Sequence, residues 1–165
     1  TQARSMVLGV STSLLHLLIP SYGVRVELPL GAAWSVRAGG FVGQQVGAGT
    51  FVEQWVWDLD ARVARALVGT RMRGLLVGLS ARHRYQDGVH VREPTEQGAR
   101  SHQVRLHAAL AGRWTGSAGA FVGVEAGGGA TREWLEVDRA AGDSQRSVAT
   151  RASLHVDLTV GWMWR

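Results

Sequence analysis

The sequence predicts an all-β fold: a closed, up-and-down antiparallel barrel of about eight strands in one domain spanning 1–165. Three observations lead to this prediction. Apolar and polar residues alternate along many segments, as they do where successive side chains point to opposite faces of a strand. Glycine occurs 22 times and proline only 3 times, which fits many strands joined by tight turns. No segment has the spacing of an amphipathic helix.

The composition excludes several classes of protein. The chain has no cysteine, so it has neither a disulfide framework nor a cysteine-based metal site. Its formal charge is +5, and all 18 basic residues are arginine. These arginines are spread along the chain among acidic residues, so we expect no nucleic-acid partner. No run approaches the roughly 18 consecutive apolar residues of a membrane helix.

The expected strands follow one another from turn to turn. They span roughly 6–18, 22–30, 33–46, 51–65, 71–85, 101–114, a segment from about 118, and 154–164. Short turns separate most of them, for example at Gly31-Ala32 and at 47–50. Two long polar connections, at about 86–100 and 128–147, follow the fifth and seventh strands.

Each expected strand has one apolar face, and the residues on these faces indicate what surrounds the strand. In the first four strands these faces carry Leu8, Val10, Thr12 and Leu14; Tyr22, Val24, Val26, Leu28 and Leu30; Trp34, Val36, Ala38, Gly40 and Val42; and Trp55, Trp57, Leu59, Ala61 and Val63. In the last four they carry Leu75, Val77, Leu79 and Ala81; Val104, Leu106, Ala108, Leu110 and Trp114; Ala120, Val122, Val124 and Ala126; and Leu154, Val156, Leu158, Val160, Trp162 and Trp164. Few of the mid-strand residues are large, which suits a face coated by lipid better than a closely packed core.

The opposite faces mix charges of both signs with glycine. This pattern favours a narrow lumen crossed by arginine–carboxylate pairs over a solvated outer surface. The expected lumen charge network consists of Arg25, Glu27, Arg37, Asp58, Asp60, Arg62, Arg82, Arg105, Arg113, Glu125 and Asp157. The fold prediction therefore becomes a transmembrane β-barrel with its polar faces inside.

The aromatic residues sort into two levels when the strands are placed alternately up and down from a periplasmic N-terminus. Trp34, Trp114, Trp162 and Trp164 fall near the periplasmic rim, and Tyr22, Trp55, Trp57, Tyr85 and Trp134 near the outer rim. Indole and phenol rings prefer such interfaces, where one end of the ring is wet. The same placement puts both long connections on the extracellular side, an asymmetry typical of outer-membrane barrels.

The final strand, 154–164, strengthens this interpretation because it has the length of a tilted membrane strand, roughly 9–11 residues. With its turns, loops and girdles, the chain resembles the small eight-stranded outer-membrane barrels, the group that contains the outer-membrane protein A transmembrane domain. In that group the last strand usually ends in an aromatic residue that the barrel assembly machinery reads. Here Trp164 is followed by Arg165, which departs from that pattern.

The resemblance implies a location in a bacterial outer membrane and a lumen filled by side chains. We expect a structural or interaction protein of the cell envelope, with outer-membrane lipid, lipopolysaccharide or another envelope protein as partners. The alternatives are a lipid A-modifying enzyme that transfers or removes acyl groups, a small pore, and a soluble lipocalin-like binding barrel. No cofactor is expected, and no pair of histidines has the spacing of metal ligands.

Ser153, His155 and Asp157 are the residues that an acyl-transferring enzyme could use. They lie at i, i+2 and i+4 on the polar face of the last strand. Same-face neighbours along a strand are about 6.5–7 Å apart, whereas a relay needs hydrogen-bond distances near 3 Å. The spacing thus predicts a lumen hydrogen-bond network, with completion of a triad by cross-strand partners left open.

Arginines also surround the two long connections. Arg84, Arg92 and Arg100 lie around one, and Arg132, Arg139, Arg146 and Arg151 around the other. Guanidinium groups there would either pair with lipopolysaccharide phosphates or balance the acidic residues of the same segments.

Overall fold

The computed structural model describes residues 8–15, 21–46, 51–70, 73–92, 95–138 and 144–164. These residues form one sheet of antiparallel strands. The strands are β1 (Leu8–Ser13), β2 (Ser21–Leu30), β3 (Trp34–Val46), β4 (Phe51–Thr70), β5 (Arg73–Arg92), β6 (Thr95–Thr115), β7 (Ala120–Asp138) and β8 (Ser144–Trp164). In the described part of the chain, no helix has the length and hydrophobicity needed to span a lipid bilayer.

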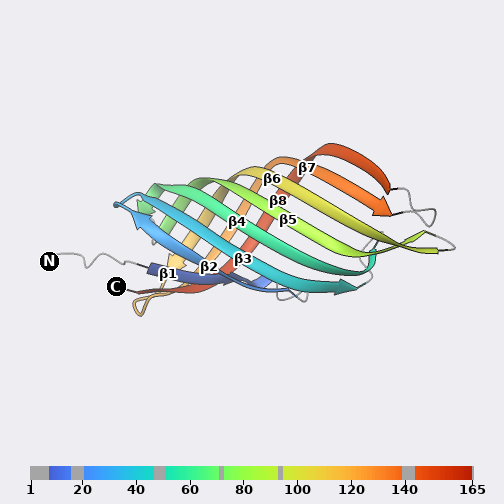
Figure 1. The fold of residues 1–165 in the computed structure, drawn as a ribbon. Coiled ribbons are helices and arrows are strands. Elements are labelled where there is room, and N and C mark those ends of the chain that lie inside the picture. Colours follow the sequence, from blue (N-terminus) through green and yellow to red (C-terminus); the bar gives the residue numbers. More distant parts are fainter. Residues whose placement is uncertain are drawn as a thin grey trace.

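Each strand pairs with the next along the chain, and the sheet closes on itself (Figure 1). Closure comes from β1 and β8, which pair from Leu8↔Trp164 to Ser13↔Thr159. The prediction of eight antiparallel strands in up-and-down order is confirmed. Tight turns make this order possible: Gly31, which opens the turn from β2 to β3, has φ 75°, a backbone conformation that residues with a Cβ rarely adopt.

The register sets the inclination of the strands. A row of paired residues that leaves β8 at Trp162 runs through Val10, Ala61 and Ala130 and returns to β8 at Ala152, ten positions earlier. With strand spacing and residue rise at their usual values, this offset inclines the strands by about 40° to the axis of the ring. A step to the next strand then raises the level along the axis by about 3 Å, and one residue along a strand changes it by about 2.5 Å.

The two faces of the sheet are sorted as the alternation predicts, with polar residues inside. Among the described residues, nineteen polar or charged ones are buried, including Arg25, Asp58 and Asp157, whereas the buried hydrophobic ones form only small groups such as Phe121 with Met163. The outer face is apolar and exposed: Leu79 keeps 69% of its surface accessible. The interior is thus polar, the reverse of a soluble protein's core.

The sequence predicts long loops at about 86–100 and 128–147, and this prediction is wrong. Most of 86–100 continues β5 and β6, which remain paired as far as Arg92↔Thr95, and most of 128–147 continues β7 and β8 as far as Asp138↔Ser144. Backbone pairing extends these strands although polar residues on both faces hide the alternation. The connections that follow β5 and β7 are 93–94 and 139–143, which lie outside the described residues.

Other boundaries move as well. The first strand was expected over 6–18 but ends at Ser13 within the described residues, and β4 continues beyond 65 to Thr70. We call the end of the ring with Leu8 and Trp164 the terminal end and the opposite end the distal end. The strands end at similar levels at the terminal end, whereas β5–β8 project far beyond β1 and β2 at the distal end (Figure 1). There, Ser144–Ala152 of β8 is exposed on both faces.

Candidate functional site

The interior of the ring holds all eleven residues predicted as a lumen charge network. Every one of them is buried or half-buried on the inner face. They divide by level into two groups, to which Arg84, Glu133 and Arg151 also belong. The terminal cluster consists of Arg25, Arg37, Arg62, Arg113, Glu27, Asp60, Glu125 and Asp157, and the distal cluster of Arg82, Arg84, Arg105, Arg151, Asp58 and Glu133.

Arg25 is at the centre of the terminal cluster and is fully buried. Its Nε lies 2.6 Å from Asp60 Oδ2, and its Nη1 lies 2.5 Å from Asp157 Oδ2. Asp157 also accepts a hydrogen bond from Ser13, and the Arg25 guanidinium lies 4.7 Å from the centre of the Phe41 ring. Two carboxylates and an aromatic face therefore compensate a charge that has no surface exposed to bulk solvent.

The remaining terminal arginines are held in the same way. Arg113 donates two hydrogen bonds to Glu27, at 2.8 and 2.6 Å, and stacks over Phe121. Arg62 Nη1 lies 2.5 Å from Glu125 Oε2, which is also 3.8 Å from Arg37 Nη2. Four arginines thus face four carboxylates, and the terminal cluster is electrically balanced.

Glycines on the inner face let these long side chains reach across neighbouring strands. Gly39 pairs with Arg25 on one side and Asp60 on the other. A Cβ at Gly39 would lie 2.5 Å from Arg25 Cγ and 2.7 Å from the Val24 carbonyl oxygen. The same arrangement recurs where Gly129 separates His107 from Ser153. Glycine is therefore required at position 39 by the ion pairs of Arg25 and at position 129 by the contact between His107 and Ser153.

The distal cluster is less well balanced. Arg84 makes a bidentate pair with Asp58, at 2.9 and 2.7 Å. Arg82 lies 3.7 Å from Asp60, which is the carboxylate that Arg25 holds more closely. Arg105 donates to the side-chain oxygen of Gln103 at 2.6 Å, and none of the described carboxylates lies within ion-pair distance of it.

The structure does not assemble Ser153, His155 and Asp157 into a triad. Ser153 Oγ lies 2.8 Å from Nε2 of His107, on the other side of Gly129. His155 Nε2 lies 3.2 Å from Glu125, and Asp157 is occupied by Arg25 and Ser13. The rings of His107 and His155 stack with their centres 5.3 Å apart.

His107 is the residue that the sequence reasoning missed. It lies two strands from Ser153, and only the register brings the two together. The sequence signal was the run Gly127–Gly129, which removes the side chain between them.

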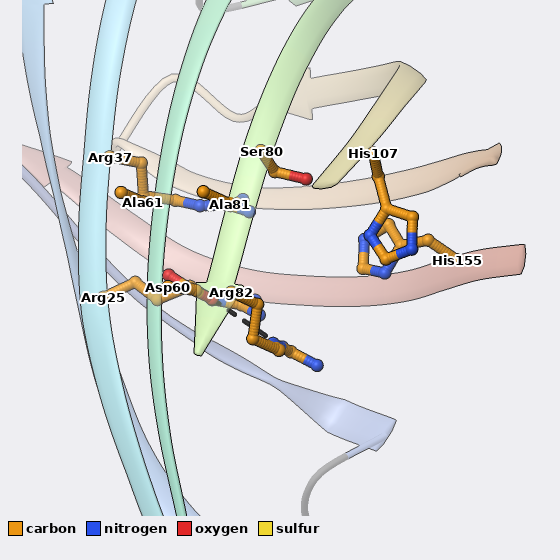
Figure 2. Close-up of a pocket in the computed structure, with 9 residues that line it drawn as sticks. All are labelled: Arg25, Arg37, Asp60, Ala61, Ser80, Ala81, Arg82, His107 and His155. Carbon is orange, nitrogen blue, oxygen red and sulfur yellow. Dashed lines mark hydrogen bonds and ion pairs between the residues drawn. The ribbon is translucent and has the colours of Figure 1, made fainter. Parts of the chain in front are cut away.

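A small cavity lies within the ring beside these groups (Figure 2). It has room for about one water molecule. Its lining includes Arg25, Arg37, Arg82, His107 and His155 but only one carboxylate, Asp60. Side chains fill most of the described interior around this cavity, whose lining is cationic. No group of three or more metal-ligating side chains comes together in the described residues.

The aromatic residues predicted as girdles all lie on the outer face. From the register, Trp34, Trp114 and Trp162 share one level near the terminal end, with Trp164 slightly beyond it. The levels of Trp55, Trp57 and Tyr85 agree within about 5 Å and lie about 25 Å further along the axis. Tyr22 lies below this second level, and Trp134 lies above it.

The arginines predicted around long loops are distributed differently. Arg84 and Arg151 point inward, whereas Arg100, Arg132 and Arg146 are exposed on strands. The Arg92 side chain and Arg139 lie outside the described residues.

No family model, curated protein or solved structure matches this chain.

Proposed function

We propose that this chain is an integral outer-membrane β-barrel of the bacterial cell envelope, with a structural or interaction role. The observation that carries the proposal is the reversed sorting of the ring: charges inside, and exposed Val, Leu and Ala outside between two aromatic levels. The separation of about 25 Å between those levels equals the height of the apolar band of outer-membrane barrels.

A non-enzymatic role is supported by the interior. Buried ion pairs and a cavity of about one water leave no continuous channel among the described residues. The projecting strands β5–β8 form an extended surface beyond the distal aromatic level, where a protein anchored in the membrane could present contacts to an envelope partner.

Two substitutions to arginine test membrane insertion. Leu79 lies on the outer face midway between the two aromatic levels, and Val148 lies on the outer face about 10 Å beyond the distal level. We expect Leu79→Arg to lower the free energy of unfolding in lipid vesicles by about 2–4 kcal/mol, and Val148→Arg by about 0–1 kcal/mol.

The measurement is urea unfolding followed by tryptophan fluorescence in phosphatidylcholine vesicles. Equal, small effects of the two substitutions, together with a folded wild-type protein in buffer without lipid or detergent, would overturn the proposal. That result would instead support a soluble barrel, in which Leu79 is an ordinary surface residue.

A second candidate function, acyl transfer, is favoured by one contact, the 2.8 Å separation of Ser153 Oγ and His107 Nε2. In such a step, Ser153 Oγ bonds to the ester carbonyl carbon while His107 takes its proton and delivers it to the departing alcohol. Water then hydrolyses the acyl-serine.

A fluorophosphonate probe tests this candidate. Labelling of wild type that is lost in both Ser153→Ala and His107→Gln supports it. Absence of labelling in folded wild-type protein rejects it.

A further inference from the structure

The distal cluster places like charges directly opposite each other. Arg82 and Arg105 are direct register partners on the inner face of β5 and β6. Like charges directly opposite each other in an antiparallel pair destabilise a sheet. From Arg105 the row continues through Thr131 to Arg151, so three of the four residues from Arg82 to Arg151 are arginines.

The carboxylates near this row are held more closely by other arginines. Asp60, which precedes Arg82 in the row, lies 2.6 Å from Arg25 and 3.7 Å from Arg82. Asp58 is held bidentately by Arg84. Four arginines of the distal cluster thus face two carboxylates of their own, Asp58 and Glu133, in contrast to the balanced terminal cluster.

Arg105 is the residue with the clearest deficit. Its Nε is buried and has no hydrogen-bond partner in the described part of the chain. Three arginines, Arg82, Arg84 and Arg151, and one carboxylate, Asp58, lie within electrostatic range of its guanidinium. Below it on the same inner face, His107 and His155 line the cationic cavity (Figure 2).

The site is open to solvent from the distal end. The Arg151 side chain is 61% exposed, and its contact with Glu133, at 3.3 Å, is one that an exposed pair exchanges readily. Arg82, Arg84 and Arg105 are half-buried. An anion entering from this end would therefore meet guanidinium groups from β5, β6 and β8.

We propose that the distal cluster binds a phosphate group, held by Arg82, Arg105 and Arg151. Three guanidinium groups match a doubly charged tetrahedral oxyanion, because each offers a planar pair of donors to two phosphate oxygens. A single carboxylate would satisfy fewer of these donors. The phosphate source is either a free phosphate compound or the headgroup of a lipid, and both share this chemistry.

The first test is titration of the purified protein with inorganic phosphate in a non-ionic detergent, followed by calorimetry. We expect saturable binding that weakens at least tenfold in Arg105→Gln. The matched control is Arg132→Gln, which removes the same charge from the outer face of the neighbouring strand, beside Val104, and leaves binding unchanged. No saturable binding to wild type, or equal losses in both variants, would overturn the proposal.

Folding of the variant provides an independent readout. In phosphate-free buffer, Arg105→Gln relieves the repulsion with Arg82, so its unfolding midpoint in urea should equal or exceed that of wild type. A purely structural role of Arg105 predicts a lower midpoint, and that result would contradict the site.

Competition identifies the ligand class and its source. Acetate at the same concentration should not displace phosphate, and equal displacement by acetate would overturn the assignment to phosphate. Glycerol phosphate and vesicles of phosphatidylcholine containing phosphatidic acid then distinguish the sources. Displacement by glycerol phosphate alone supports a soluble ligand, and displacement by the vesicles supports a lipid headgroup.

Discussion

The terminal and distal clusters lie in the same ring and use the same residue types, yet they differ in how the charges of their arginines are compensated. In the terminal cluster four arginines meet four carboxylates, and Arg25, Arg37, Arg62 and Arg113 are at most 5% exposed. In the distal cluster the arginines outnumber the carboxylates and are half-buried or exposed. Bulk solvent is in contact with the second cluster, whereas the arginines of the first have almost no accessible surface. Balance is therefore required only where burial removes the alternative of solvation.

The difference between the two clusters follows from the lengths of the strands. β1 and β2 line the ring near the terminal end, where every strand contributes to a closed wall. At the distal end β8 continues through Ser144–Ala152 with both faces exposed. A closed wall makes desolvation complete and demands paired charges, whereas the open part leaves room for excess charge.

The largest effect is expected for loss of the central buried arginine. Arg25→Met leaves Asp60 and Asp157 buried without their principal cation, and breaking a buried pair typically costs about 3–5 kcal/mol. Urea unfolding followed by tryptophan fluorescence measures the change. Arg151→Met at the distal end is the control, with an expected change below about 1 kcal/mol because the side chain is exposed. Similar losses in the two variants would remove the distinction between the clusters.

A smaller effect is expected for the glycine that the terminal ion pairs cross. Gly39→Ala places a methyl group 2.5 Å from Arg25 Cγ, so we expect destabilisation of about 1–3 kcal/mol. Gly40→Ala is the adjacent control on the outer face, where the nearest atom to the new Cβ is Leu59 Cδ2 at 3.4 Å. Its effect should be near zero, since an exposed strand position tolerates alanine. If both variants unfold at the same urea concentration, the inner glycine has no special role.

These two positions show how much of the fold and site could be predicted from the sequence. Strict alternation placed Arg25 and Asp157 on the polar faces of their strands. The scarcity of large residues on the apolar faces indicated that the polar faces lie inside. The alternation predicted faces but not partners, because the partner of Arg25 depends on the register between β2 and β4. For the same reason the sequence left open which cross-strand partners Ser153, His155 and Asp157 contact.

The ends of the strands could not be predicted from the sequence either. Beyond Tyr85 and before Ser101, polar residues occupy both faces, so the periodicity that marks a half-buried strand disappears. Pairing of β5 with β6 nevertheless continues there through backbone hydrogen bonds, which any side chain permits. The same loss of signal explains why the distal cluster, which includes Arg84 and Arg151, was not recognised as a unit.

An intermediate effect is expected where the distal cluster meets the cavity. Ser153→Ala removes the partner of His107 Nε2, and loss of one such hydrogen bond costs about 1 kcal/mol. The change should appear in urea unfolding without any change in the interior ion pairs of the terminal cluster. Ser144→Ala, at the exposed start of β8, is the control and should have no effect. A loss above that for Gly39→Ala would mean that the distal interior is as tightly packed as the terminal one.

The smallest effect is expected for the exposed ion pair that joins the projecting ends of β7 and β8. Arg146 lies 3.1 Å from Glu136, and its side chain is 76% exposed. Water screens this attraction and ordering the two side chains costs entropy, so Arg146→Gln should change the free energy of unfolding by no more than about 0.5 kcal/mol. That small change should vanish at high salt, whereas the effect of Arg25→Met should persist, because buried pairs are poorly screened. Comparing the two variants at low and high salt therefore separates charge that is solvated from charge that is paired. A salt-insensitive loss in Arg146→Gln would show that the projecting strands shield their charges as the closed wall does.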